Sequence, residues 1–177
     1  MKKKQTLFLI FIAVGCVTYS DEISQMNSLY RNSQYQEALK ELEASSLKDN
    51  KNRLLYHMEK GMILERMGDK KKARDLLDKA SRISDELYTT SVSKTAASFI
   101  VNESTQDYEG ESYEKIAVHT IKALSYLENS MYSEARVEAR KINNKLYQIT
   151  QNLGDKHNSY REDAFARYLA GLICHVF

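Results

Sequence analysis

The side chains best suited to acid–base, nucleophilic or metal chemistry in this sequence belong to four histidines and two cysteines. His57 and His119 stand at matching positions of two similar segments. This arrangement is compatible with a paired site, but it is more typical of two bulky packing residues. Cys174 and His175 do not form a nucleophile pair, because adjacent residues of a helix point in different directions. The sequence has no HExxH, phosphate-binding glycine loop or GxSxG motif. It therefore predicts a protein that is not an enzyme.

A polar segment at 102–112 gathers four carboxylates and no basic residue. Hard cations such as Ca²⁺ prefer several oxygen ligands, but the segment has no EF-hand pattern. The simpler interpretation is a solvated loop whose last acids stabilise the start of the next helix through its macrodipole. We expect no metal and no cofactor, yet a long loop is a natural place for a binding determinant. The four acids are Glu103, Asp107, Glu109 and Glu111.

Basic residues are also candidates for recognition, although they are barely in excess. The chain has 26 Lys and Arg against 24 Asp and Glu. Because nucleic-acid-binding proteins usually carry a clustered basic excess, we expect no nucleic-acid partner. Arg136 and Arg140 share one face of a predicted helix and could receive an acidic peptide or a lipid headgroup. The alternative is a solvated helix face on which Glu134 and Glu138 are their ion-pair partners.

The elements that position these residues come from an internal repeat. Residues 32–38 (NSQYQEA) and 129–135 (NSMYSEA) agree at five of seven positions, and 67–73 (MGDKKKA) keeps the small turn residue and the alanine. Ala38 and Ala73 are 35 positions apart, close to the period of about 34 residues of a tetratricopeptide repeat. Apolar residues at helical spacing flank each motif, and small residues at the contacts let antiparallel helices approach closely.

The chain resembles tetratricopeptide-repeat (TPR) proteins over residues 23–83 and 114–146, although the usual tryptophan and closing proline are missing. The complete absence of proline fits a chain that is helical almost throughout. The resemblance implies an all-α fold in which TPR-like helical hairpins stack as a short solenoid; the alternative is a generic antiparallel helical bundle. Candidates for contact with a partner on the concave side of such a solenoid are Tyr30, His57, Arg66, His119 and Tyr126.

The repeat is interrupted by a predicted irregular insertion near 84–112. Ala73 and Ala135 are 62 positions apart, which is less than two periods of about 34 residues. Weak helix formers are frequent in 87–100, and we still expect a helical continuation there before the polar loop. The predicted last helix, 163–177, is apolar on several faces, whereas solenoids normally end in a cap with a polar outer face. We expect either that the natural chain continues or that another protein covers this helix, and we favour the first.

The first residues have the pattern of a secretory signal. Three lysines precede eight apolar residues at 7–14, a run too short to span a bilayer as a helix. It ends in Ala13-Val14-Gly15-Cys16, which resembles the lipobox of bacterial lipoproteins. The resemblance implies cleavage of a signal peptide at 1–15, acylation of Cys16, a short tether at 16–22 and a helical domain at 23–177. The alternatives are a cleaved signal in which Cys16 is incidental, and an uncleaved anchor.

Several stretches of the second half resemble a group of bacterial envelope lipoproteins with such repeats: 108–111 (YEGE), 123–127 (ALSYL), 138–143 (EARKIN) and 162–172 (EDAFARYLAGL). The resemblance supports localisation more than function. It implies a lipid-anchored domain in the cell envelope. We favour an anchor in the outer membrane, with the domain facing the periplasm. We expect a non-enzymatic adaptor that binds another envelope protein or peptide. The alternative is a small-molecule or glycan-binding module that uses the 102–112 loop.

Overall fold

A computed structural model describes residues 19–48, 50–96, 107–153 and 163–176 of the chain. Within these ranges the fold is all-α, as predicted, and contains no strand. The predicted signal peptide at 1–15 and Cys16 lie outside the described residues. The helices are α1 (Tyr19–Arg31), α2 (Tyr35–Ala44), α3 (Arg53–Arg66), α4 (Lys70–Ala96), α5 (Ser112–Glu128), α6 (Tyr132–Leu153) and α7 (Ala164–Val176), with 3-10 turns at Ser46–Lys48 and Asn50–Asn52.

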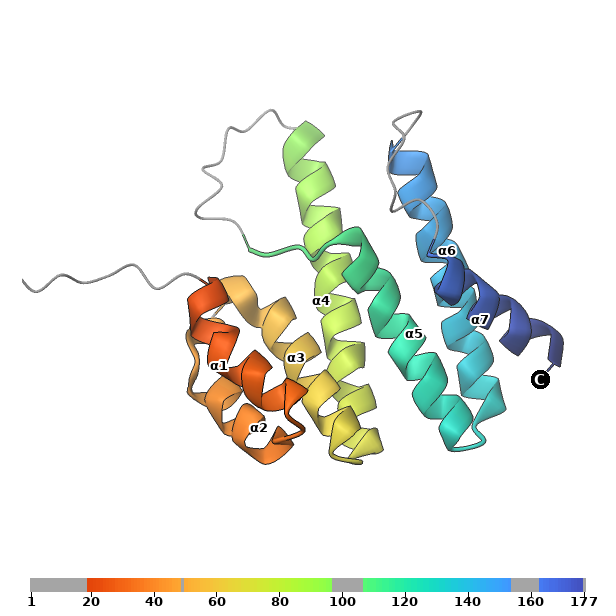
Figure 1. The fold of residues 1–177 in the computed structure, drawn as a ribbon. Helices are drawn as coiled ribbons and strands as arrows, with labels where there is room; N and C mark the ends of the chain where they lie inside the picture. The colour runs from red at the N-terminus through yellow and green to blue at the C-terminus, as the bar shows by residue number, and fades with distance from the viewer. Residues whose placement is uncertain (1–18, 49, 97–106, 154–162, 177) are drawn as a thin grey trace, which may run out of the picture.

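The helices form successive hairpins that lie side by side (Figure 1). α1 packs on α2, α3 on α4 and α5 on α6, and neighbouring pairs meet through α2 with α3 and through α4 with α5. α7 crosses α6 and also touches α5. None of the helices in the described ranges combines the length and the apolar character needed to cross a membrane.

Each hairpin turns at the small residue of its repeat motif. Ser33, Gly68 and Ser130 adopt left-handed backbone conformations, with φ of 61°, 85° and 57°. After each of them, the next amide donates a hydrogen bond to the carbonyl five residues earlier, at 2.9, 3.0 and 2.9 Å respectively. This is the Schellman pattern that satisfies the last carbonyls of a helix. The shared motif therefore specifies the same helix ending three times.

The described parts of the predicted insertion near 84–112 belong largely to helices. Residues 84–96 continue α4, which is 27 residues long, as the expectation of a helical continuation required. The polar loop ends one residue before the predicted boundary, because Ser112 already belongs to α5. Glu111 caps that helix: its side chain accepts the amide of Glu114, and the Glu114 side chain accepts the amide of Glu111. One of the last acids of the loop therefore lies at the helix start, where it acts as a hydrogen-bonding cap.

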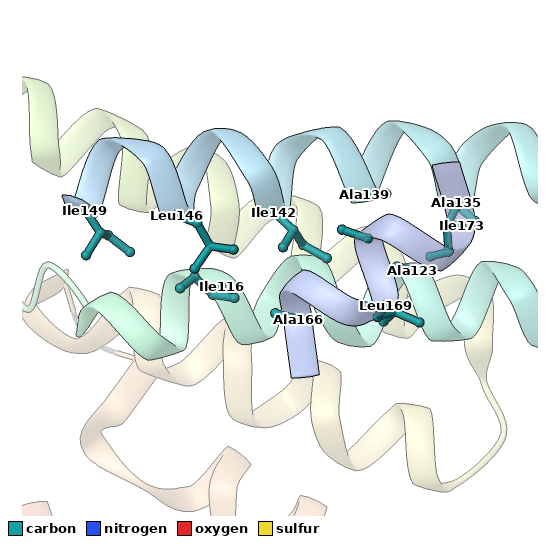
Figure 2. Packing of buried hydrophobic residues seen from close by; sticks show 11 residues of the cluster. Ile116, Ala123, Ala135, Ala139, Ile142, Leu146, Ile149, Ala166, Leu169 and Ile173 are labelled. Carbon is teal, nitrogen blue, oxygen red and sulfur yellow. The ribbon is translucent and has the colours of Figure 1, made fainter. Parts of the chain in front are cut away.

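The apolar faces of the helices meet in separate clusters. One lies between α5, α6 and α7 and combines large aliphatic residues with alanines (Figure 2). Another joins α1, α2 and α3 through Ile23, Met26, Leu42 and Ile63, among others. The alanines permit close approach of the backbones. The first cluster comprises Ile116, Ala123, Ala135, Ala139, Ile142, Leu146, Ile149, Ala166, Leu169, Ala170 and Ile173.

α7 is apolar on both its faces, as its sequence predicted. Ala166, Leu169, Ala170 and Ile173 are buried against α5 and α6. The opposite side exposes large apolar side chains at helical spacing. These are Phe165, Tyr168, Leu172 and Val176.

Candidate functional site

A groove of about 430 Å³ runs across the first helices of the three hairpins, α1, α3 and α5. Apolar side chains from α3 and α5 form part of its surface, two tyrosines stand at the α1–α2 turn, and charged groups gather where α3 turns into α4. Its lining residues are Tyr30, Tyr35, Met62, Glu65, Arg66, Lys70, Ile121, Leu124 and Glu128.

The aromatic side of the groove is held in place by Arg66. The rings of Tyr30 and Tyr35 meet edge to face with centroids 5.5 Å apart. The Arg66 guanidinium lies 5.9 Å from the centre of the Tyr35 ring, and its Nε donates to the Tyr35 hydroxyl at 3.4 Å. Hydrogen bonds with Ser33 and then with Arg66 lower the pKa of Tyr35. The phenol and the guanidinium therefore contact each other at this side of the groove.

The charged end of the groove is almost neutralised internally. Lys70 Nζ lies 2.7 Å from a carboxylate oxygen of Glu65 and 2.7 Å from one of Glu128. Burial acts to lower the pKa of Lys70, but its bonds to Glu128 and Glu65 prevail and raise it. Arg66 differs, because within the described residues no carboxylate lies within ion-pair distance of it. Arg66 is thus the cation of the groove that is available to an incoming acid.

Of the predicted partner-contact residues, the structure brings only two into the groove. Tyr30 and Arg66 line it. His57 is half-buried beside Tyr56, with ring centroids 5.5 Å apart, and lies outside the groove lining.

The other candidates do not line the groove. His119 is only 2% exposed, so it cannot touch a partner in the groove. Tyr126 is half-buried under the Arg74 guanidinium, which lies 4.9 Å from its ring centre. Arg136 and Arg140, which the sequence offers as a separate basic face rather than as groove residues, are exposed on α6. Position within the repeat indicated the helix but not the direction of each side chain.

A buried ionic junction between α4, α5 and α6 holds His119 instead. Its Nδ1 lies 2.7 Å from Glu138, and Lys122 Nζ lies 2.8 Å from the other oxygen of that carboxylate. Lys122 also pairs with Asp78 on α4, and Lys141 approaches Glu138 at 3.0 Å. The expectation that Glu138 belongs to a solvated face is wrong, because the residue is 3% exposed.

Electrostatics keep Glu138 ionised despite its burial. Removal from water would raise the pKa of its carboxyl, but hydrogen bonds from His119 and Lys122 outweigh that cost and hold the pKa at about 2. Lys122 is itself 1% exposed. A buried charge is tolerated only when it is paired, so the two residues depend on each other.

Ser81, His119 and Glu138 are hydrogen-bonded in the order of a hydrolytic triad, but their surroundings favour a structural role. Ser81 Oγ lies 3.4 Å from His119 Nε2. The cavity beside them has room of about 10 Å³, which suits about one water molecule. Ser81 lies inside α4, where backbone amides are used by the helix and cannot stabilise an oxyanion. Hydrogen bonds with Ser81 and Glu138 orient the imidazole of His119.

No group of three potential metal ligands occurs among the residues that the structure describes; Glu103 lies outside them. Comparisons with known protein families, curated proteins and solved structures gave no match. A function for this chain is therefore inferred from its own geometry.

Proposed function

We propose that this chain is a non-enzymatic adaptor whose groove across α1, α3 and α5 binds a segment of a partner protein. The observation that carries the proposal is that the first helices of three successive hairpins line one groove. A TPR-like arrangement is supported by the hairpin order and by the repeated Schellman turns. Grooves between helices suit amphipathic helices and extended peptides.

The groove also indicates the chemistry of that segment. Met62, Ile121 and Leu124 offer apolar contacts, and Leu124 is 36% exposed in the absence of a partner. Arg66 is held by Tyr35 and has no acidic partner within the described part of the chain. The best-fitting segment therefore carries apolar side chains for the α3–α5 surface and one carboxylate for Arg66, because Arg can bind a carboxylate with two parallel hydrogen bonds.

A selection from a random peptide library on the full chain tests the proposal. We expect the recovered peptides to combine apolar residues with Asp or Glu. Binding of a recovered peptide should weaken about tenfold or more in Arg66→Glu, since the change replaces an attractive charge by a repulsive one. Arg140→Glu is the matched control, because it reverses an exposed arginine on α6. Peptides that lose affinity in Arg140→Glu and keep it in Arg66→Glu would contradict the groove and favour the α6 face.

We further propose that acylation of Cys16 anchors this adaptor in a bacterial cell envelope. Support comes from the sequence Ala13-Val14-Gly15-Cys16 after a basic and apolar start. An alkyne analogue of palmitate should label the full chain in bacterial cells, and Cys16→Ser should abolish the label. Cys174→Ser is the control, because Cys174 is an exposed thiol that the proposal does not acylate. Equal labelling of wild type and Cys16→Ser would exclude the anchor.

A second candidate function, the binding of a small molecule, is supported by one observation. Glu109 and Ser112, at the end of the predicted 102–112 loop, line a second hollow that is separate from the groove. The chemistry of this hollow is specific enough to suggest a ligand class.

A further inference from the structure

The second hollow has a volume of about 240 Å³. It is smaller than a typical site for a drug-sized ligand, which is about 300–1,000 Å³. Side chains of α4, α5 and α6 line it together with the segment that precedes α5. Its lining residues are Ser84, Tyr88, Glu109, Ser112, Lys115, Lys145, Gln148 and Ile149.

Ser84 contributes a hydroxyl group without a hydrogen-bond partner. The residue is 6% exposed, and its Oγ is buried and makes no hydrogen bond with any part of the chain that the structure describes. A serine inside a helix commonly donates to the carbonyl four residues earlier. Thr89 and Thr90 do so on the same helix, at 2.9 and 3.0 Å. An unsatisfied buried hydroxyl costs free energy, so a ligand that accepts its hydrogen bond is favoured.

Lys115 contributes a cation without a counter-ion. Its side chain is half-buried, with Cε 3.5 Å from the place where a Cβ on Gly110 would stand. No carboxylate of the described residues lies within ion-pair distance of it, whereas Lys145 across the hollow pairs with Asp85 at 2.6 Å. Burial lowers the pKa of Lys115, and repulsion by Lys145 acts in the same direction against the attraction of Glu109. Lys115, without an ion-pair partner, and Ser84, without a hydrogen-bond partner, line the same hollow among the described residues.

We propose that this hollow binds a small organic carboxylate, whose oxygens accept hydrogen bonds from Lys115 Nζ and Ser84 Oγ. Asp85 balances Lys145 and Glu109 stands at the wall, so the hollow lacks the surplus of positive charge that a phosphate dianion needs. Tyr88 and Ile149 offer an apolar surface for the remainder of the ligand. The site is independent of the groove, and the failure of either proposal leaves the other intact.

Calorimetric titration of the full chain with three matched probes tests the ligand class. Benzoate presents a carboxylate on an apolar ring, phenyl phosphate presents a dianion on the same ring, and benzyl alcohol is neutral. We expect saturable binding of benzoate, weaker binding of phenyl phosphate and no detectable binding of benzyl alcohol. The proposal is overturned if benzoate does not bind, or if either of the other probes binds as tightly as benzoate.

Substitutions then place the site. Ser84→Ala should leave the melting temperature unchanged or raised, because its hydroxyl has no partner, and should weaken benzoate binding about tenfold, as expected for a lost hydrogen bond to a charge. Lys115→Met should weaken binding at least as much without unfolding the chain, since it removes an unpaired cation. Lys79→Met is the control, an exposed lysine of α4 outside the hollow. Unchanged benzoate binding in both Ser84→Ala and Lys115→Met would overturn the assignment.

Discussion

The apolar cluster of α1–α3 and the ionic junction of α4–α6 both hold neighbouring helices together. The first does so by apolar contacts and the second by buried ion pairs. The first contains buried apolar side chains, namely Ile23, Met26, Leu42 and Ile63. The buried hydroxyl of Ser45 donates a hydrogen bond to the Leu42 carbonyl at 2.7 Å. In the second, the buried charged side chains of the described residues are concentrated on neighbouring helices. They join α4, α5 and α6 by ion pairs.

Because of this difference, the two contacts should respond differently to substitution and to pH. Apolar contacts weaken gradually as methylene groups are lost, and they do not depend on pH. A buried ion pair depends on all its members, because removal of one leaves another charged and unpaired. The two contacts can therefore be told apart by what a single substitution does and by what acid does.

The largest effect is expected from Glu138→Leu. The substitution leaves Lys122 buried without its most buried partner and frees His119 Nδ1, and breaking a buried ion pair in this way costs about 3–5 kcal/mol. The free energy of unfolding from urea denaturation measures the loss. Adding Lys122→Met to Glu138→Leu should restore most of the stability, because neither buried charge then remains.

Leu42→Ala is the matched substitution in the apolar cluster. Leu42 is 1% exposed, and truncation of such a residue costs about 2–5 kcal/mol. We expect no single second substitution, from one apolar residue to another, to restore the stability lost in Leu42→Ala. This contrasts with Glu138→Leu, whose stability Lys122→Met should restore. If the double ionic variant is no more stable than Glu138→Leu alone, Lys122 and Glu138 do not act as a pair.

Acid should weaken the ionic junction next. Because the pKa of Glu138 is held at about 2, below its ordinary value of 4.5, the folded state binds its proton later than the unfolded state as pH falls. The stability that the carboxylate contributes is complete above pH 4.5 and is lost as pH falls through about 2. The difference in unfolding free energy between wild type and Glu138→Gln should shrink over this range by about 2–3 kcal/mol. A constant difference from pH 5 to 2 would contradict this role.

A smaller pH effect is expected on α3, at His57. Burial, followed by repulsion from Lys79 and Lys60, lowers the pKa of His57 from 6.5 to about 4, and its Nδ1 has no hydrogen-bond partner among the described residues. Protonation therefore favours the unfolded state, and stability falls as pH drops from 6.5 to about 4. After allowance for its partial exposure, the loss should be about 1–2 kcal/mol.

His57→Phe should remove this loss while keeping an aromatic ring beside Tyr56. Unfolding measured by urea at pH 7 and pH 5 gives the comparison for wild type and variant. Parallel losses in the two proteins would show that His57 stays accessible to protons in the folded state.

The sequence predicted the apolar contacts well and the ionic ones poorly. The repeated motif identified Ala38, Ala73 and Ala135 as packing residues, and all three are buried. These residues bury one face of a helix, which is a local property of the sequence.

The ionic junction depends instead on pairing between helices that are distant in the chain. Lys122 Nζ meets Asp78 from 44 residues away and Glu138 from 16 residues away, so no local spacing predicts that a lysine is buried. For the same reason helical spacing alone allows the alternative of a solvated face for Glu138, which the structure excludes. Two of the predicted contact residues, Tyr30 and Arg66, line the groove. Its charged end was not predicted, because the pairing of Lys70 with Glu128 also joins distant segments.

The smallest effect is expected at two helical glycines, Gly61 on α3 and Gly171 on α7. A Cβ added to Gly61 would lie 2.9 Å from Leu77 on α4, whereas one added to Gly171 on α7 would have nothing within 4 Å. Alanine favours a helix over glycine by about 1 kcal/mol, and overpacking costs about 1–3 kcal/mol. Gly61→Ala should therefore lose about 1 kcal/mol net, while Gly171→Ala should gain about 0.5–1 kcal/mol.

Thermal unfolding of the two variants measures the contrast. Opposite shifts of the melting temperature would show that α4 covers α3 at Gly61 and that α7 is uncovered at Gly171. A loss of stability in Gly171→Ala would mean that another surface covers α7 in solution, since the described residues leave that side free for a methyl group. In that case the exposed row of Phe165, Tyr168 and Leu172 would be the surface that is covered.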